Sequence, residues 1–231
     1  MRLASAIHYD VKIQFRSGFY FAYLIVCLIY IAVLRQIPDN LSGKITTIVV
    51  FIDPSILGFY FIGGLILLEK KQKTLSGLFV TPLSVSEYLI SKALSLTVLS
   101  LLSSLLITVS VIGLAFNILI FCITVILTSI LFVFLGIAIV VRVKDINRYL
   151  VLSPLPLIFI ILPLLDYLNI FQTNLFYLLP SHPILKLLSN SIHNSAQTPI
   201  YNFIPLLVWV LIAYLWSYHW FNKYVVEKQG S

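Results

Sequence analysis

Long apolar runs separated by short polar stretches fill most of this sequence. Six runs of about 20 residues consist mainly of Leu, Ile, Val and Phe, and each is long enough to cross the roughly 30 Å hydrocarbon layer of a membrane as a helix. These runs cover residues 19–34, 46–68, 93–114, 119–141, 150–168 and 203–221. Because they are continuous rather than alternating, they predict helices and not membrane-spanning strands. We therefore expect an all-α, polytopic membrane protein with six transmembrane helices.

The composition agrees with this pattern. The chain is 60% hydrophobic and only 10% charged, whereas a soluble domain carries about 25% charged residues. The first apolar run follows charged residues without a cleavage-site pattern, so we predict a membrane anchor rather than a removed signal peptide. Cys27 and Cys122 lie inside predicted spans, where packing is a more common role than disulfide formation or metal binding.

The polar segments predict the orientation in the membrane. Residues 1–18 mix three basic residues with spaced apolar ones, which is typical of an amphipathic helix at a membrane interface. Residues 19–231 form the predicted six-helix domain. Twelve of the fifteen Lys and Arg residues lie on the side of the two termini, which the positive-inside rule places in the cytoplasm. We expect a multi-pass protein of the inner (plasma) membrane that contacts membrane lipid, and the net charge of +7 indicates topology rather than a nucleic-acid partner.

The segment between the second and third runs, 69–92, is charged and reads EKKQKTLSGLFVTPLSVSEYLISK. Thr74 can cap a short helix, Pro82 ends it, and Ser84 or Ser86 can cap the next helix. Three apolar side chains would share one face of the short helix at i, i+3 and i+4 spacing: Leu75, Leu78 and Phe79. The pattern predicts a short helix lying across the cytoplasmic surface, and by itself it also fits an ordinary loop of a helical hairpin.

The order of residues in this segment resembles the cytoplasmic loop of ABC-2 type permeases, the membrane subunits of one large class of ABC transporters. In that family an acidic residue ends the second span. It is followed by a Thr-Leu pair, a Leu three residues on, a Thr-Pro-Leu sequence, and then a small residue and a Lys that enter the third span. The matching residues here are Glu69, Thr74, Leu75, Leu78, Thr81, Pro82, Leu83, Ser91 and Lys92. The chain departs from the pattern at Lys73, where the family often has Gly, and at Ser76, where it often has an acid. These departures affect the charge pairing expected with a partner protein. The predicted architecture of six spans matches the family over the whole chain.

The resemblance implies that this segment is a coupling helix that docks on a cytoplasmic ABC ATPase. The residues it assigns to ATPase coupling are Glu69, Thr74, Leu75, Leu78, Phe79, Thr81, Pro82 and Leu83. The chain has no G-x-x-x-x-G-K-[ST] phosphate loop, so ATP and Mg are expected on the partner ATPase and no cofactor is expected in this chain. A second permease copy, identical or paralogous, is expected as a further partner.

Asp53 and Pro54 stand inside the second apolar run. A charged side chain in a membrane costs several kcal/mol unless it faces protein or water, and Pro54 frees a backbone carbonyl and is expected to bend the helix. These residues are candidates for the translocation path at a broken helix, and a purely structural kink is the alternative. Three prolines predict a distorted fifth span. The resemblance to ABC-2 type permeases implies that residues 176–192 dip back into the outer leaflet, and a plain interfacial helix is the alternative.

These observations favour the permease subunit of an ATP-driven exporter for an amphipathic compound such as a drug, an antibiotic or a hydrophobic peptide. Polysaccharide, lipid or haem-related cargo remains an alternative, as does a non-transporting membrane protein coupled to an ATPase. The four histidines are dispersed, so we assign no metal site, and no catalytic motif for an enzyme is present.

Overall fold

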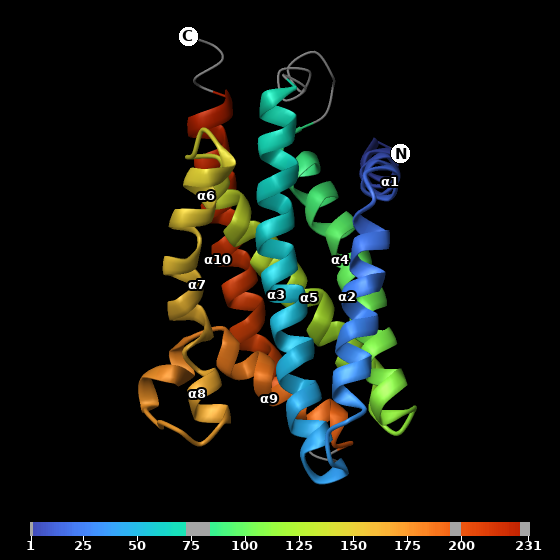
Figure 1. Cartoon of the computed structure of the whole chain (residues 1–231). Helices are drawn as coiled ribbons and strands as arrows, with labels where there is room; N and C mark the ends of the chain where they lie inside the picture. The colour runs from blue at the N-terminus through green and yellow to red at the C-terminus, as the bar shows by residue number, and fades with distance from the viewer. Residues whose placement is uncertain (1, 73–83, 195–199, 227–231) are drawn as a thin grey trace.

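The computed structural model describes residues 2–72, 84–194 and 200–226, and all regular structure in these ranges is helical (Figure 1). The first half contains α1 (Arg2–Arg16), α2 (Phe19–Leu34), α3 (Asp39–Lys71), α4 (Val85–Ile112) and α5 (Ile118–Val140). The second half contains α6 (Ile146–Leu152), α7 (Pro154–Ile161), α8 (Leu164–Tyr167), η2 (Asn174–Leu178), α9 (Ser181–Ile192), η3 (Ile200–Asn202), α10 (Phe203–Phe221) and a π-helical extension, η4 (Asn222–Val226).

Four helices in the described ranges are long and apolar enough to cross a membrane. They are α3, α4, α5 and α10 with its extension. Helices α1 and α2 meet at a bend of 67° and add a fifth span if the pair counts as one. The multi-pass, all-helical architecture is therefore confirmed, while the count of six spans stays a prediction.

The predicted fifth span is divided into three short helices. Ser153 separates α6 from α7, which begins at Pro154, and Pro163 precedes α8. Proline lacks the backbone N–H that a continuing helix needs and clashes with the preceding turn, which explains the division. The distortion expected from the prolines is confirmed, but no single long helix covers residues 150–168.

Pro54 has a smaller effect than the sequence suggested. Helix α3 runs through Pro54 as one helix of 33 residues. The expectation of a broken helix at this point is therefore wrong. Helix α3 packs against α4, α5 and α9, and neighbouring helices help a membrane helix to tolerate an internal proline.

Helix α5 forms the centre of the bundle, where it packs against α3, α4 and α10. A continuous stretch from Leu131 to Ala138 is buried. Helices α5 and α3 approach closely at Gly136, where a Cβ atom would lie only 2.8 Å from the carbonyl oxygen of Phe59 in α3. A small residue at this position therefore lets the two backbones approach closely.

The bundle has two distinct ends in Figure 1. Helix α1, the last turn of α3, the first turns of α4 and the end of α10 gather at one end, which we call the α1 end. Helices α8 and α9 lie at the opposite end, the α9 end, where α9 crosses the bundle. Whether α9 enters a membrane leaflet stays a prediction, but its buried apolar face against α3 and α5 fixes its position in the fold.

Two local sets of hydrogen bonds stabilise the helix ends at the α1 end. The side chain of Ser84 accepts a hydrogen bond from the backbone N–H of Glu87, whose carboxylate accepts one from the N–H of Ser84, a capping box that starts α4. Of the two predicted caps, Ser84 is therefore the one used. The ammonium of Lys70 donates to the carbonyls of Val140, Val141 and Val143 at 3.1, 2.9 and 3.1 Å.

Candidate functional site

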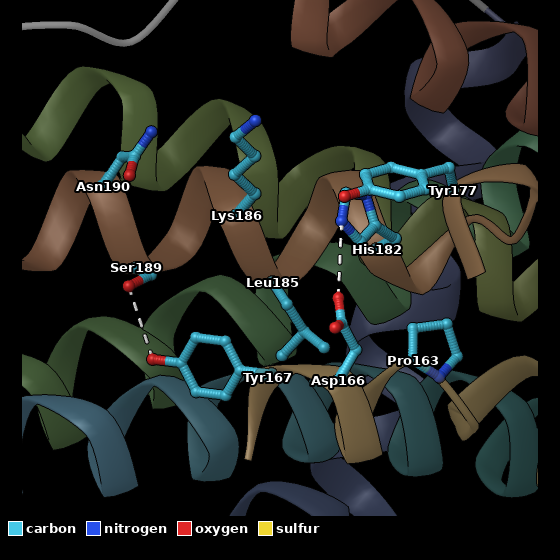
Figure 2. Close-up of a pocket in the computed structure, with 9 residues that line it drawn as sticks. All are labelled: Pro163, Asp166, Tyr167, Tyr177, His182, Leu185, Lys186, Ser189 and Asn190. Atoms are coloured by element: carbon cyan, nitrogen blue, oxygen red, sulfur yellow. Dashed lines mark hydrogen bonds and ion pairs between the residues drawn. The ribbon is translucent and has the colours of Figure 1, made fainter. Parts of the chain in front are cut away.

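Polar side chains gather at three levels of the bundle, the first of which is a pocket of about 220 Å³ at the α9 end (Figure 2). Asp166 and Tyr167 of α8 face His182 and Ser189 of α9 across this pocket, and Lys186 also lines it. The sequence predicts no site here, because these residues show no motif spacing and only the packing of α8 on α9 brings them together.

Two polar contacts join α8 to α9 across the pocket. Nε2 of His182 lies 3.8 Å from Oδ2 of Asp166, and the Tyr167 hydroxyl donates to Oγ of Ser189 at 3.4 Å. Burial lowers the pKa of His182, the nearby Asp166 raises it and Lys186 lowers it again, so the net shift is downward. A lowered pKa makes His182 a neutral imidazole near pH 7, and the pair with Asp166 is then a weak dipolar contact.

The second level is a cleft of about 240 Å³ between α2 and α3 that contains Asp53. The Asp53 side chain belongs to the protein interior, with 3% of its surface exposed. Its carboxylate accepts a hydrogen bond from Ser103 of α4 at 3.0 Å, but the same hydroxyl lies 2.8 Å from the carbonyl of Ser100 and has only one proton to share. No described residue forms an ion pair with Asp53.

The walls of this cleft are mostly apolar and aromatic. Tyr23 and Tyr30 of α2 and Phe61 of α3 line it. The buried hydroxyl of Tyr23 lies beside the Asp53 carboxylate and can donate a hydrogen bond to it. Asp53 therefore lines a cavity, and its role in transport stays a prediction.

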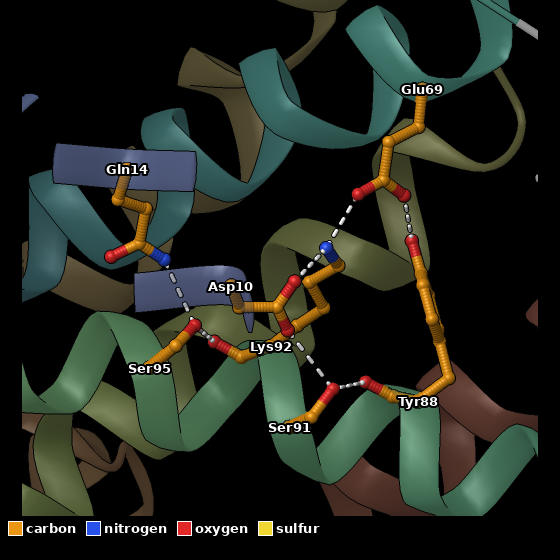
Figure 3. A network of polar contacts seen from close by, with 7 residues as sticks. All are labelled: Asp10, Gln14, Glu69, Tyr88, Ser91, Lys92 and Ser95. Carbon is orange, nitrogen blue, oxygen red and sulfur yellow. Dashed lines mark hydrogen bonds and ion pairs between the residues drawn. The ribbon is translucent and has the colours of Figure 1, made fainter. Parts of the chain in front are cut away.

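The third level is a buried ion cluster at the α1 end, formed by Asp10, Glu69 and Lys92 (Figure 3). The ammonium of Lys92 lies 2.6 Å from Oδ1 of Asp10 and 2.5 Å from Oε1 of Glu69. The three residues come from α1, α3 and α4, so one lysine connects three helices. Lys92 is only 4% exposed.

Neutral side chains complete the hydrogen bonding around this ion cluster. The Tyr88 hydroxyl donates to Oε2 of Glu69 at 2.5 Å, and Oγ of Ser91 lies 3.1 Å from Oδ2 of Asp10. One turn further along α1, the amide of Gln14 donates to Ser95 at 2.9 Å. Breaking a buried pair by removing one partner typically costs about 3–5 kcal/mol, because the remaining charge is left uncompensated. This network therefore fixes α1 firmly on α4.

Of the predicted coupling residues, only Glu69 lies in the described part of the chain, where it belongs to the ion cluster. The others lie outside the described residues: Thr74, Leu75, Leu78, Phe79, Thr81, Pro82 and Leu83. Sequence analysis noted Glu69 and Lys92 as parts of a motif but missed Asp10. The available signal was the i, i+4 spacing of Asp10 and Gln14, which puts both polar groups on one side of α1.

Neither the pocket nor the ion cluster resembles a metal centre. Within residues 2–72, 84–194 and 200–226, no group of three His, Cys, Asp or Glu side chains is arranged to hold a metal ion. The three levels instead offer paired charges at the α1 end, a buried carboxylate in an apolar cleft, and a more open polar pocket at the α9 end.

Comparison with known proteins identifies the family. The model of the fluoroquinolones export permease protein family matches residues 1–229. Fluoroquinolones export permease proteins from two strains of Mycobacterium tuberculosis, CDC 1551 / Oshkosh and H37Rv, are each 26% identical to this chain over 233 residues, covering 99% of this chain and 98% of the relative. The chain therefore belongs to the fluoroquinolones export permease protein family, which is consistent with the resemblance of its 69–92 segment to ABC-2 type permeases.

Proposed function

We propose that this chain is the membrane-spanning subunit of an ATP-driven ABC exporter of the inner membrane, with both termini in the cytoplasm. Membership of an export permease family supports a transport subunit rather than an enzyme. The excess of Lys and Arg on the side of the termini supports the orientation. In this orientation the α1 end faces the cytoplasm and the α9 end faces outward.

The ion cluster is the observation that carries the proposal. Glu69 stands near the end of α3 and Lys92 near the start of α4, so the cluster joins the two helices that flank residues 73–83. Asp10 attaches α1 to the same point. A displacement applied to the segment 69–92 would reach three helices at once through charged contacts, and packed helices respond to such a displacement as rigid bodies.

The energy source in this proposal is a separate ATPase. The chain lacks a phosphate loop, so ATP and Mg bind the partner subunit. Docking is assigned to the apolar face of the coupling segment, centred on Leu75, Leu78 and Phe79. A second permease copy completes the pathway, as in the ABC-2 type permeases that the segment resembles.

The proposed cargo is an amphipathic compound that passes Asp53 and Pro54. The relatives are named for fluoroquinolone export, which makes a fluoroquinolone the first compound to test on this chain. The cleft at Asp53 carries a carboxylate and apolar walls, a lining that would repel a polyanionic polysaccharide. Lipid and haem-related compounds belong in the same test panel.

The test uses the chain co-expressed with its ABC ATPase. Leu78→Asp places a charge on the proposed docking face, so it is expected to abolish co-purification of the ATPase and ATP-dependent drug uptake by inside-out vesicles, while the chain still inserts. The matched control is Ile146→Asp, which places the same charge on an exposed apolar side chain at the start of α6.

The two variants together decide whether the ATPase docks on the coupling segment. The proposal requires that Ile146→Asp keeps both the complex and the uptake. A stable, active complex with Leu78→Asp would show that the ATPase does not dock on this segment. Uptake that persists without ATP would remove the ATP-driven mechanism altogether.

A further inference from the structure

The Asp53 cleft has the chemistry of a binding site for a particular class of ligand. The cleft lies between α2 and α3, and Asp53 is the one ionisable carboxyl group among its lining residues. Its other lining residues are Ala, Val, Ile, Leu, Phe and Tyr. A ligand in this cleft therefore meets one carboxylate within an apolar and aromatic surface.

The carboxylate of Asp53 is poorly compensated by the protein. Its partners are neutral hydroxyls, that of Tyr23 and that of Ser103, and no described cation pairs with it. Buried charges in proteins are normally paired, as Asp10 is in the ion cluster. A cation that entered the cleft would supply the missing partner.

The aromatic walls favour the same kind of ligand. Tyr23, Tyr30 and Phe61 surround the cleft, and aromatic faces attract ammonium groups within about 6 Å of the ring centroid. The hydroxyl of Tyr23 lies beside Asp53, and its oxygen can accept an N–H hydrogen bond from a ligand. A protonated amine thus finds a carboxylate, a hydroxyl acceptor and aromatic faces in one place.

The position of the cleft indicates that its ligand also has an apolar part. Asp53 stands near the middle of α3, and the neighbouring helix α2 exposes Phe21, Leu24 and Ile25 on its outer surface. Such a surface faces lipid in a membrane-spanning helix. A volume of about 240 Å³ is smaller than the roughly 300–1,000 Å³ typical of pockets that enclose a whole drug, so the cleft would hold only one end of a larger molecule.

From this geometry we infer that the Asp53 cleft binds lipophilic amines in their protonated form. The ammonium lies against Asp53 and Tyr23, and the apolar body extends between α2 and α3. This inference rests on the proposed function, since it identifies the cationic amphiphiles among the candidate cargo. The pocket at the α9 end is less suited to this role, because Asp166 already faces His182 and is more exposed than Asp53.

The experiment measures binding to the purified chain alone, in lipid nanodiscs at pH 7, by equilibrium dialysis. The probes are norfloxacin, a fluoroquinolone with a basic secondary amine, and N-acetylnorfloxacin, in which an amide replaces that amine. The native chain is expected to bind norfloxacin about tenfold more tightly, the ratio that corresponds to one charge-assisted contact. In Asp53→Asn the two affinities are expected to agree within about twofold, because the charge that distinguishes the probes is gone.

Two control variants complete the design. Asp166→Asn removes a carboxylate outside the cleft and is expected to keep the native preference for the amine. Asp53→Glu retains the charge and is expected to keep the preference even if Asp53→Asn proves unstable.

Equal affinity of the native chain for the two probes, or an unchanged preference in Asp53→Asn, would overturn the inference and indicate that Asp53 is a neutral structural group. Because no ATPase is present, this result is independent of the docking test. Leu78→Asp is expected to bind norfloxacin normally, so a failure of amine binding and a failure of ATPase docking are recognised separately.

Discussion

Asp10 and Asp53 are two buried carboxylates in opposite surroundings. Asp10 is 7% exposed and Asp53 is 3% exposed. Asp10 meets the ammonium of Lys92, whereas Asp53 meets no described cation and has the neutral hydroxyls of Ser103 and Tyr23 beside it. Burial alone therefore does not define the role of an acid in a membrane helix. A compensated acid holds helices together, and an uncompensated one is available to a ligand.

The largest effect is expected from Lys92→Met, which leaves two carboxylates without their cation. By analogy with other broken buried pairs, the loss of folding free energy is about 3–5 kcal/mol, seen as a large drop in the thermal midpoint in detergent. The control is Lys71→Met at an exposed position of the same end of the bundle, with a change near zero. Equal midpoints for the two variants would show that the ion cluster does not stabilise the fold.

A smaller effect is expected from Tyr88→Phe, which removes the hydroxyl that donates to Glu69. A hydrogen bond to a charged group contributes about 1.5–3 kcal/mol, so the thermal midpoint should fall, but less than in Lys92→Met. Tyr9→Phe, at an exposed position of α1, serves as the control. A larger loss in Tyr88→Phe than in Lys92→Met would mean that the hydroxyl, and not the lysine, is the main partner of Glu69.

The pair of His182 and Asp166 is expected to respond weakly to pH. Since the folded-state pKa of His182 lies below its ordinary value of 6.5, the unfolded chain binds the proton first as the pH falls. Its contribution to stability is therefore complete above about pH 6.5 and is lost as the pH falls through the lowered pKa. Thermal midpoints measured from pH 7.5 to 5 should decline less in His182→Gln than in the native chain, with His8→Gln as the exposed control.

The smallest effect on stability is expected from Asp53→Leu. This substitution removes an uncompensated charge from an apolar cleft, so the thermal midpoint should stay the same or rise slightly. Assembly with the ATPase should also be unchanged, while drug transport should fall. A strong loss of stability would place Asp53 with Asp10 as a structural acid, and unchanged transport would remove it from the translocation path.

Sequence pattern predicted the helices well where apolar runs are uninterrupted. The run at 203–221 coincides with α10, and the run at 119–141 differs from α5 by one residue at each end. The run at 46–68 gave too short a helix, because α3 extends through polar residues from Asp39. Prolines at the fifth run indicated distortion but could not show that three separate helices result, since that depends on packing.

The candidate site was less predictable, because its residues are far apart in the sequence. Lys92 and Asp10 are separated by 82 positions, and only the packing of α1 on α4 brings them together. The unusual position of Asp53 in an apolar run indicated a special environment. The cleft around it depends on how α2 lies against α3, which no local pattern specifies.

The contacts of Lys70 affect how α3 can move relative to its neighbours. Its ammonium holds three carbonyls at the end of α5, while the next residue towards the N-terminus, Glu69, holds Lys92 of α4. Two adjacent side chains in the last turn of α3 thus bind it to α4 and to α5. A force applied to α3 at this point would therefore move α4 and α5 together with it. The first half of the chain would then move as one rigid body, without relative sliding of its helices.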